Sequence, residues 1–95
     1  MVTKQVVDMT IGELCEYFEG AILYDAHSFR ARYCRSEGGR ELKKRGPSAI
    51  EDITTHLIAT RENRSAEVKD AWTLLLNDIC DAHPRLAVNI STLVG

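Results

Sequence analysis

Hydrophobic residues recur at spacings of three and four along three stretches of the chain, and this spacing marks one face of an α-helix. The first stretch has its apolar positions at Ile11, Leu14, Phe18 and Ile22. Thr10 and Glu13 precede it at the spacing of a capping box, in which the side chain of each residue bonds the backbone N–H of the other. The pattern therefore predicts a helix that starts at residue 11.

The end of this first helix is ambiguous. The same spacing continues through Ala26, Phe29 and Tyr33 to a stop at Gly38-Gly39, whereas Gly20 and the cluster 25–28 favour a break into two helices. A third interpretation is a β-hairpin around residues 28–45, because residues 29–34 alternate in polarity and "EGGR" is typical of a turn. The helical pattern matches more positions, so we prefer helix and keep the hairpin as the alternative.

Two further helices are predicted after the Gly46-Pro47 break. Ser48 and Glu51 have the spacing of a second capping box, followed by an apolar stripe at Ile50, Ile53 and Leu57. Ser65 is a good N-cap for the third helix, and Pro84 disfavours helix at the residue before it. The stripe of the third helix is Val68, Trp72, Leu75 and Ile79.

The C-terminal tail, residues 84–94, fits two patterns. Leu86, Ile90 and Leu93 suit a short helix begun by Pro84, while Leu86, Val88 and Ile90 suit a strand. A strand there would have the N-terminal stretch "VTKQVV" as its natural partner.

Together these elements predict an all-α fold, a small antiparallel bundle of three to four helices in a single domain spanning residues 1–95. The expected core is the sum of the apolar stripes. Its residues are Ile11, Leu14, Phe18, Ile22, Ile50, Ile53, Leu57, Val68, Trp72, Leu75 and Ile79.

Composition narrows the class of protein. Hydrophobic residues make up 44% and charged residues 27% of the 95 residues, which is typical of globular chains. No apolar run reaches the roughly 18 residues of a membrane helix, and the N-terminus lacks the apolar region of a secretory signal. The three cysteines are too few and too widely spaced for a disulfide framework or a zinc site. We therefore expect a cytoplasmic protein with reduced thiols and no metal.

Positive charge is concentrated in the middle of the chain. Residues 29–46 hold seven basic and two acidic residues, a balance of +5, although the whole chain has a net charge of −2. A segment of this kind can bind a phosphate backbone, pair with acids of its own chain, or be a solvated connector. The candidate nucleic-acid or anion contacts are Arg30, Arg32, Arg35, Arg40, Lys43, Lys44 and Arg45.

The third helix has an unusually wide apolar side. Leu74, Leu75 and Leu76 are consecutive, so more than half of its circumference is apolar, as in a central helix or one side of an oligomer interface. Trp72, Leu74 and Leu76 are thus a candidate interaction face. The leading hypothesis is a non-catalytic regulatory or adaptor protein that binds another protein and itself, and the second is a nucleic-acid-binding regulator.

Motifs for other chemistry are missing from the sequence. It contains no phosphate-binding glycine loop, no HExxH and no GxSxG, so we expect no enzyme, no cofactor and no small-molecule substrate. Cys34 is the one candidate reactive thiol, because the neighbouring arginines, Arg32 and Arg35 among them, favour the thiolate.

Overall fold

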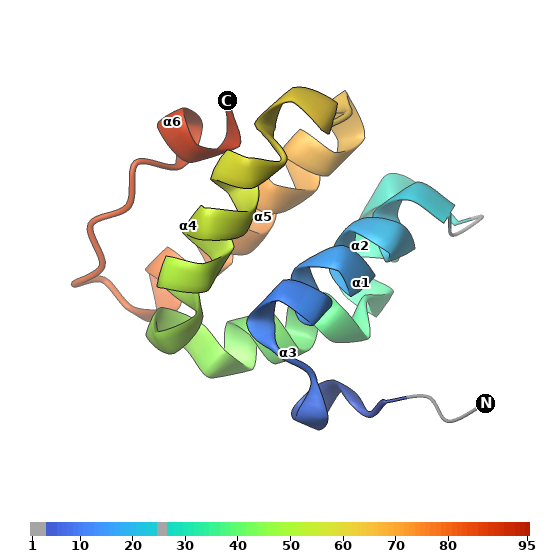
Figure 1. Ribbon diagram of the computed structural model, residues 1–95, viewed down its shortest axis with the longest axis horizontal. Coiled ribbons are helices and arrows are strands. Elements are labelled where there is room, and N and C mark those ends of the chain that lie inside the picture. The colour runs from blue at the N-terminus through green and yellow to red at the C-terminus, as the bar shows by residue number, and fades with distance from the viewer. Residues whose placement is uncertain (1–3, 25–26) are drawn as a thin grey trace.

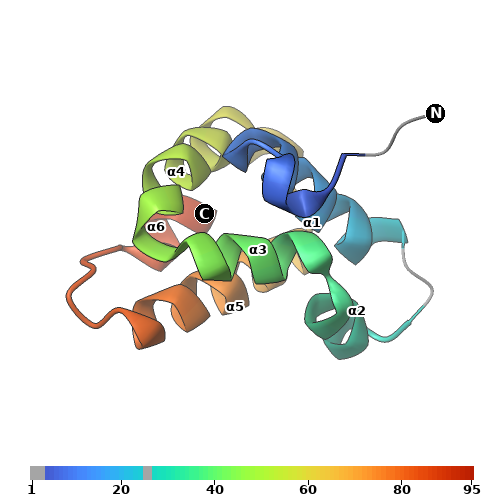
Figure 2. The ribbon, with the colours of Figure 1, turned by 90° about the horizontal axis from the view of Figure 1, so that it is seen from below.

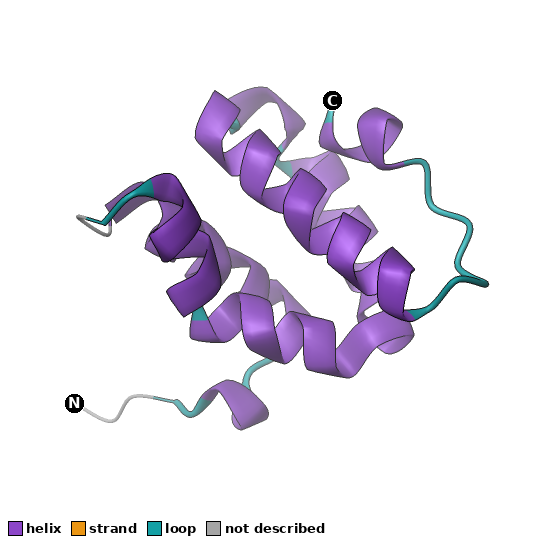
Figure 3. Cartoon of the chain, turned by 180° about the vertical axis from the view of Figure 1, so that it is seen from behind, coloured by secondary structure: helices purple, strands orange, loops and turns teal. Residues whose placement is uncertain are grey.

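The chain is all-helical in the computed structural model, which describes residues 4–24 and 27–95, and none of these forms a strand. The α-helices are α1 (Ile11–Tyr24), α2 (Phe29–Arg35), α3 (Glu37–Arg45), α4 (Ile50–Ala59), α5 (Ala66–Ala82) and α6 (Ile90–Val94). Three 3-10 helices add η1 (Val6–Asp8), η2 (Gly46–Ala49) and η3 (Arg61–Asn63). The all-α prediction is confirmed, with more and shorter helices than the sequence pattern indicated (Figure 3).

Helix α1 is the centre of the packing. It contacts α2, α3, α4 and α5, while α6 packs on α4 and α5. Figure 1 shows α5 returning in the direction opposite to α4, and Figure 2 shows α3 lying between α1 and α5. The radius of gyration is 12.6 Å, close to the roughly 12–13 Å expected for one compact unit of this length.

Local caps explain where several helices begin. In the capping box of α1, the Thr10 N–H donates to Glu13 Oε1 at 2.9 Å and the Glu13 N–H donates to Thr10 Oγ1 at 3.1 Å. The predicted cap of α5 is also formed, since Ser65 Oγ accepts from the Val68 N–H at 3.3 Å. These short-range signals were sufficient to place both N-termini.

The predicted capping box at Ser48 and Glu51 is wrong. Helix α3 ends at Gly46, whose φ of 58° lies outside the helical region. The chain then passes from η2 into α4 through Ala49, whose backbone is already helical, so Ser48 does not stand at the N-terminus of α4. The Ser48 hydroxyl instead donates back to the Arg45 carbonyl at 2.7 Å. Serine hydroxyls compete for nearby carbonyls in this way when the backbone is already helical.

The hairpin alternative for residues 28–45 is not formed, and neither is the single long helix that would end at Gly38-Gly39. The first helix stops at Tyr24, and Ala26, which the long-helix interpretation used, lies outside the described residues. Two helices follow, each capped by a serine: Ser28 accepts from the Ala31 N–H, and Ser36 accepts from the Gly39 N–H. The break near residues 25–28 was the correct alternative.

Gly38 and Gly39 form the first turn of α3 rather than a helix stop. A Cβ on Gly38 would lie 3.1 Å from Phe18 N and 3.2 Å from Leu14 O, both backbone atoms of α1. A Cβ on Gly39 would lie 3.0 Å from the Phe18 ring. The glycine pair therefore allows α3 to approach the backbone of α1 closely.

The tail is helical only at its end. Residues 84–89 are irregular, and α6 begins at Ile90, where Asn89 Oδ1 accepts from the Thr92 N–H at 3.1 Å. The helix is thus started by Asn89 and not by Pro84. The strand alternative is not formed, since Val6 and Val7, its proposed partners, lie in η1.

Most of the predicted core is buried. Ile11 and Ile50 are only partly buried, and the remaining nine predicted residues are buried as expected. The structure adds six residues, several of them from α3, η2 and the tail: Cys15, Leu42, Ala49, Ala71, Leu76 and Val94.

Candidate interaction surface

Two residues of the basic segment, Arg32 and Lys43, contact the acidic helix α5 of the same chain. Arg32 donates to Glu67 at 2.7 Å and to the Ile22 carbonyl. Lys43 lies 3.7 Å from Asp78 and 5.1 Å from the centre of the Tyr33 ring. Acidic residues of the same chain therefore neutralise part of the positive charge of the basic segment.

Tyr33 strengthens the same contact between α2 and α5. Its hydroxyl donates to Asp78 at 2.5 Å, and burial together with this carboxylate raises the pKa of the phenol well above its ordinary value. The ring also packs edge-on against Phe18. Tyr33 is thus committed to the fold and is not available to stack on a nucleic-acid base.

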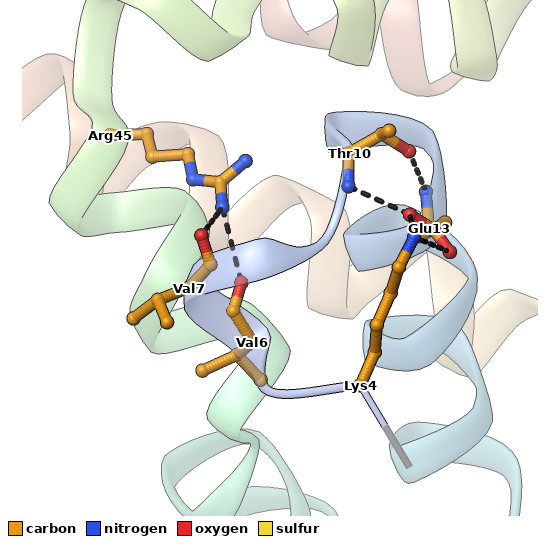
Figure 4. A network of polar contacts seen from close by, with 6 residues as sticks. All are labelled: Lys4, Val6, Val7, Thr10, Glu13 and Arg45. Carbon is orange, nitrogen blue, oxygen red and sulfur yellow. Dashed lines mark hydrogen bonds and ion pairs between the residues drawn. The ribbon is translucent and has the colours of Figure 1, made fainter. Parts of the chain in front are cut away.

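Two other arginines bind backbone carbonyls, and Figure 4 shows one of them, Arg45, with Val6 and Val7. Arg45 donates to the carbonyls of Val6 and Val7 at 3.1 and 3.3 Å and pairs with Glu41 at 3.0 Å, so it fixes η1 to α3. Arg40 donates to the Cys34 carbonyl at the end of α2 at 3.1 Å. Carbonyls at a helix end are natural partners for a cation.

The remaining basic residues do not make a uniform positive face. Arg30 and Lys44 are exposed and make no hydrogen bond or ion pair to another described residue, and Arg35 is exposed as well. On the outer face of α3, Arg40 and Lys44 alternate with two acids, Glu37 and Glu41, around one shallow depression. The structure therefore does not gather the seven predicted contacts on one free surface.

The predicted interaction face on α5 is wrong for two of its three residues. Trp72 and Leu76 are fully buried, at 0% exposure, and only Leu74 is exposed, at 41%. Helix α5 is covered by α1 and α3 and also by α6, so its wide apolar side is satisfied within the chain. Sequence analysis missed this because α3 and α6 were not recognised as covering elements.

A polar cluster joins α1, α4 and α5 inside the bundle. Glu19 Oε2 accepts from His56 Nε2 at 3.0 Å and from Trp72 Nε1 at 2.8 Å. Burial by itself would raise the pKa of Glu19, but these two hydrogen bonds and the charges of His56 and Arg64 lower it overall. The carboxylate is therefore ionised and only accepts, so His56 Nε2 carries the proton in this contact.

The cluster of Glu19, His56 and Trp72 borders a small cavity, but among the described residues no activated nucleophile lies beside it. The cavity has a volume of about 170 Å³ and is lined by Glu19, Leu23, Thr60, Asn63, Arg64, Ser65 and Val68. Cys15 is nearby, but burial and the charges of Glu19, Asp52 and Glu16 raise the pKa of its thiol to about 12. The arrangement holds a charge in place and stabilises the fold.

The outer face of α1 carries exposed apolar side chains that the sequence analysis did not single out. Tyr17, Leu23 and Tyr24 are 44%, 46% and 85% exposed and lie off the buried stripe Leu14–Phe18–Ile22. Tyr17 borders Gly38 of α3 on one flank of the face, and Leu23 lines the cavity on the other. Gly20 is at the centre of this face, because helix geometry places it between positions 17, 23 and 24. We call Glu16, Tyr17, Gly20, Leu23 and Tyr24 the α1 outer face.

The cysteines are free, with Cys15 buried and Cys34 exposed. Exposure of Cys34 is consistent with an accessible thiol, although Arg32, one of the arginines expected to act on it, contacts Glu67. Among the described residues, no group of three or more His, Cys, Asp or Glu side chains is placed to hold a metal ion.

None of the described helices is long and apolar enough to cross a membrane. No protein-family model, curated protein or solved structure matches the chain. Large apolar side chains remain uncovered on the α1 outer face.

Proposed function

We propose that the protein is a small non-catalytic interaction module that binds another protein through the α1 outer face. The observation that carries this proposal is the exposure of Tyr17, Leu23 and Tyr24 on one side of one helix. Tyrosine is enriched at protein interfaces, because its ring contributes apolar area while its hydroxyl keeps a polar partner. An exposed apolar cluster of this kind is typical of a docking surface.

The rest of the fold supports this role for α1. The inner side of α1 is held by four other helices, and the Glu19 cluster fixes it to α4 and α5. A binding surface on a rigid element loses little conformational entropy when it binds. The outer face is therefore presented in one orientation, whatever the partner.

Photo-crosslinking tests the proposed surface. A photo-reactive amino acid in place of Tyr24 is expected to form a covalent adduct with a partner protein in the cells that produce the chain. The matched control places the same group at Leu74, which is similarly exposed but lies on α5. Adding Leu23→Glu to the first variant should remove the adduct, because a charge within the surface costs its desolvation on binding.

Equal adducts from positions 24 and 74, or none from position 24, would contradict the proposed surface. The mass of the adduct also separates the kinds of partner. An adduct of twice the chain mass indicates a second copy, and any other mass indicates a different protein.

Nucleic-acid binding, the second hypothesis, leads to a separate prediction. Because Arg32, Lys43 and Arg45 are engaged within the chain, we expect no tight binding of mixed-sequence DNA or RNA even at low salt. A fluorescence-anisotropy titration at about 50 and about 200 mM salt spans the range over which phosphate contacts lose several decades of affinity. Micromolar binding that disappears at the higher salt would assign function to the basic segment instead.

A further inference from the structure

We infer that α6 is a releasable strap over a binding site, and that this site accepts the C-terminal end of an amphipathic helix from a partner protein. The site consists of the surface of α4 and α5 beneath α6 together with three basic side chains, Arg61, Arg64 and Lys69, and we call it the α6 receptor. It is a second binding site beyond the proposed function, because it lies on α4 and α5 and not on the outer face of α1.

The α6 receptor binds every carbonyl that the end of α6 leaves free. The last four carbonyls of a helix have no partner within the helix, and here they belong to residues 92–95. Each accepts from a basic side chain, which the helix dipole also favours at this end. The bonds are Arg61 to Thr92 at 3.1 Å, Arg64 to Leu93 and Val94 at 3.5 and 2.8 Å, and Lys69 to Gly95 at 3.4 Å.

The apolar side of α6 defines what else the receptor can bind. Ile90 and Leu93 pack on the core, and Val94 is buried in it. Their spacing of three and four is that of the anchors by which an amphipathic helix docks into a groove. Because the basic side chains bind backbone carbonyls, which every helix end offers, another helix with this apolar spacing would satisfy the same receptor.

The basic side chains of the receptor have no acid to neutralise them. Arg61, Arg64 and Lys69 form no ion pair with a carboxylate of the described chain. Arg64 is partly buried and its Nε has no acceptor among the described residues. Burial lowers the pKa of Arg64, the charge of Glu19 opposes this shift, and the charge of Arg61 adds to it. An empty receptor would leave these donors without carbonyls, so it favours an occupant.

Helix α6 depends on the receptor for its structure. Its five residues are far fewer than the roughly 12 that a helix needs to persist alone in water. Figure 1 shows its connector, residues 84–89, as a wide loop outside the bundle. Within the described chain, residues 84–88 make one backbone hydrogen bond, from the Leu86 N–H to the His83 carbonyl at 3.0 Å.

The rest of the core does not include the tail. Among the described residues, every core side chain with no exposed surface comes before residue 84. Segments with few buried contacts and an exposed connector open locally, at a lower free energy than the whole fold. Release of α6 therefore leaves the packing around α1 in place and uncovers an apolar groove on α4 and α5.

Amide hydrogen exchange of the full chain tests the release of α6. The Leu93 N–H bonds the Asn89 carbonyl at 3.1 Å within α6. After correction for intrinsic rates, we expect this group to exchange at least about tenfold faster than the Trp72 and Leu75 N–H groups of α5, with little dependence on low urea. Equal rates with equal urea dependence would mean that α6 leaves only when the whole protein unfolds, and the strap would be ruled out.

An NMR titration with a synthetic peptide of residues 84–95 tests the receptor. The full chain carrying Ile90→Asp and Leu93→Asp is the strap-released variant, and near-UV circular dichroism of Trp72 checks its fold. We expect it to bind the peptide with a dissociation constant at least about tenfold lower than the wild type, because the attached competitor no longer fills the site. A peptide with serine at positions 90, 93 and 94 should not bind.

The basic side chains are tested in the strap-released variant. Arg64→Gln should abolish peptide binding, but Arg64 also donates to the Leu57 carbonyl of α4, so its loss also affects the fold. Lys69→Gln avoids this problem, because the Lys69 side chain donates to the Gly95 carbonyl of the tail, and it should weaken binding severalfold. Arg30→Gln is the control, since Arg30 is exposed on α2 and makes no hydrogen bond or ion pair to the described chain.

Tighter peptide binding by the strap-released variant, together with a monomeric wild type, supports a receptor for a partner helix. Equal binding by wild type and strap-released variant, or binding that Lys69→Gln leaves unchanged, would overturn it. Sedimentation equilibrium separates the remaining occupant. A wild-type dimer that the strap-released variant does not form would show that α6 of a second copy fills the receptor, and would end the inference of a different partner.

Discussion

Replacing Gly38 with alanine is expected to lower the free energy of unfolding by about 2 kcal/mol, as overpacking in a well-packed interior does. The new methyl group would lie 3.1 Å from Phe18 N and 3.2 Å from Leu14 O. Both are backbone atoms of α1, so they cannot move away without shifting the helix. Urea unfolding followed by circular dichroism measures the change directly.

The matched control for this prediction is Gly20→Ala, measured in dilute solution. It makes the same chemical change within a helix, but its Cβ meets nothing within 4 Å. Helix propensity then acts alone, and we expect the free energy of unfolding to rise by up to about 1 kcal/mol. If both substitutions changed stability in the same direction, close approach of α3 to α1 would not be the reason for Gly38.

Gly38 and Gly39 make a packing contact with α1 that the local sequence could not predict. A Gly-Gly pair after a helical pattern is typical of a helix end, because glycine favours the C-terminal turn. Nothing in the local sequence indicates that the same pair lies against the backbone of α1. The signal that was available is Ser36, two residues earlier, which is a good N-cap and does cap α3.

Predictions from short-range patterns were mostly confirmed, and those from long-range packing were not. The caps at Thr10 and Ser65 depend on residues three positions away, and both are formed. The cap expected at Ser48 failed because Ser48 lies within η2, which leads into α4 through Ala49 with helical backbone, although α3 itself ends at Gly46. The boundary between two segments is a property of tertiary structure as much as of the residues at the boundary.

The interaction surface illustrates the same limit. The wide apolar side of α5 indicated an interface, but α3 and α6 cover Trp72 and Leu76. Sequence alone does not show how much of an apolar helix its neighbours will cover. The reverse holds for α1, where Tyr17 and Tyr24 lie off the main stripe and remain exposed, at 44% and 85%, although Tyr17 borders Gly38 of α3.

Charge segregation was recognised in the sequence, but its use was left open among several alternatives. The structure shows internal pairing of the basic segment with α5, through Arg32 with Glu67 and Lys43 with Asp78. Both pairs join residues more than thirty positions apart, so no local pattern could have identified the partners. Such pairs fix how α2 and α3 lie on α5 more than they add to stability.

Glu19→Gln is the second substitution with a large expected effect, a loss of about 2 kcal/mol, because hydrogen bonds to a charged group contribute more than neutral ones. Glu19 Oε2 accepts from both His56 and Trp72. Both bonds go to one oxygen, so a glutamine carbonyl can accept from both donors, but it carries no charge and both hydrogen bonds become weaker. Glu16→Gln is the control, since Glu16 lies on the same helix, is exposed and has no hydrogen bond or ion pair to the rest of the described chain.

The loss caused by Glu19→Gln is expected to depend on pH. The folded state lowers the pKa of Glu19 below its ordinary value of 4.5, so the ionised carboxylate stabilises the fold fully above that value. This contribution is lost as pH falls through the lower folded pKa, so the gap in stability between wild type and variant should narrow as pH falls below 4.5. Glu13, whose pKa is also lowered, is present in both proteins, and its effect cancels in the comparison. A gap that stays constant down to the lowest pH would mean that Glu19 contributes through its shape and not through its charge.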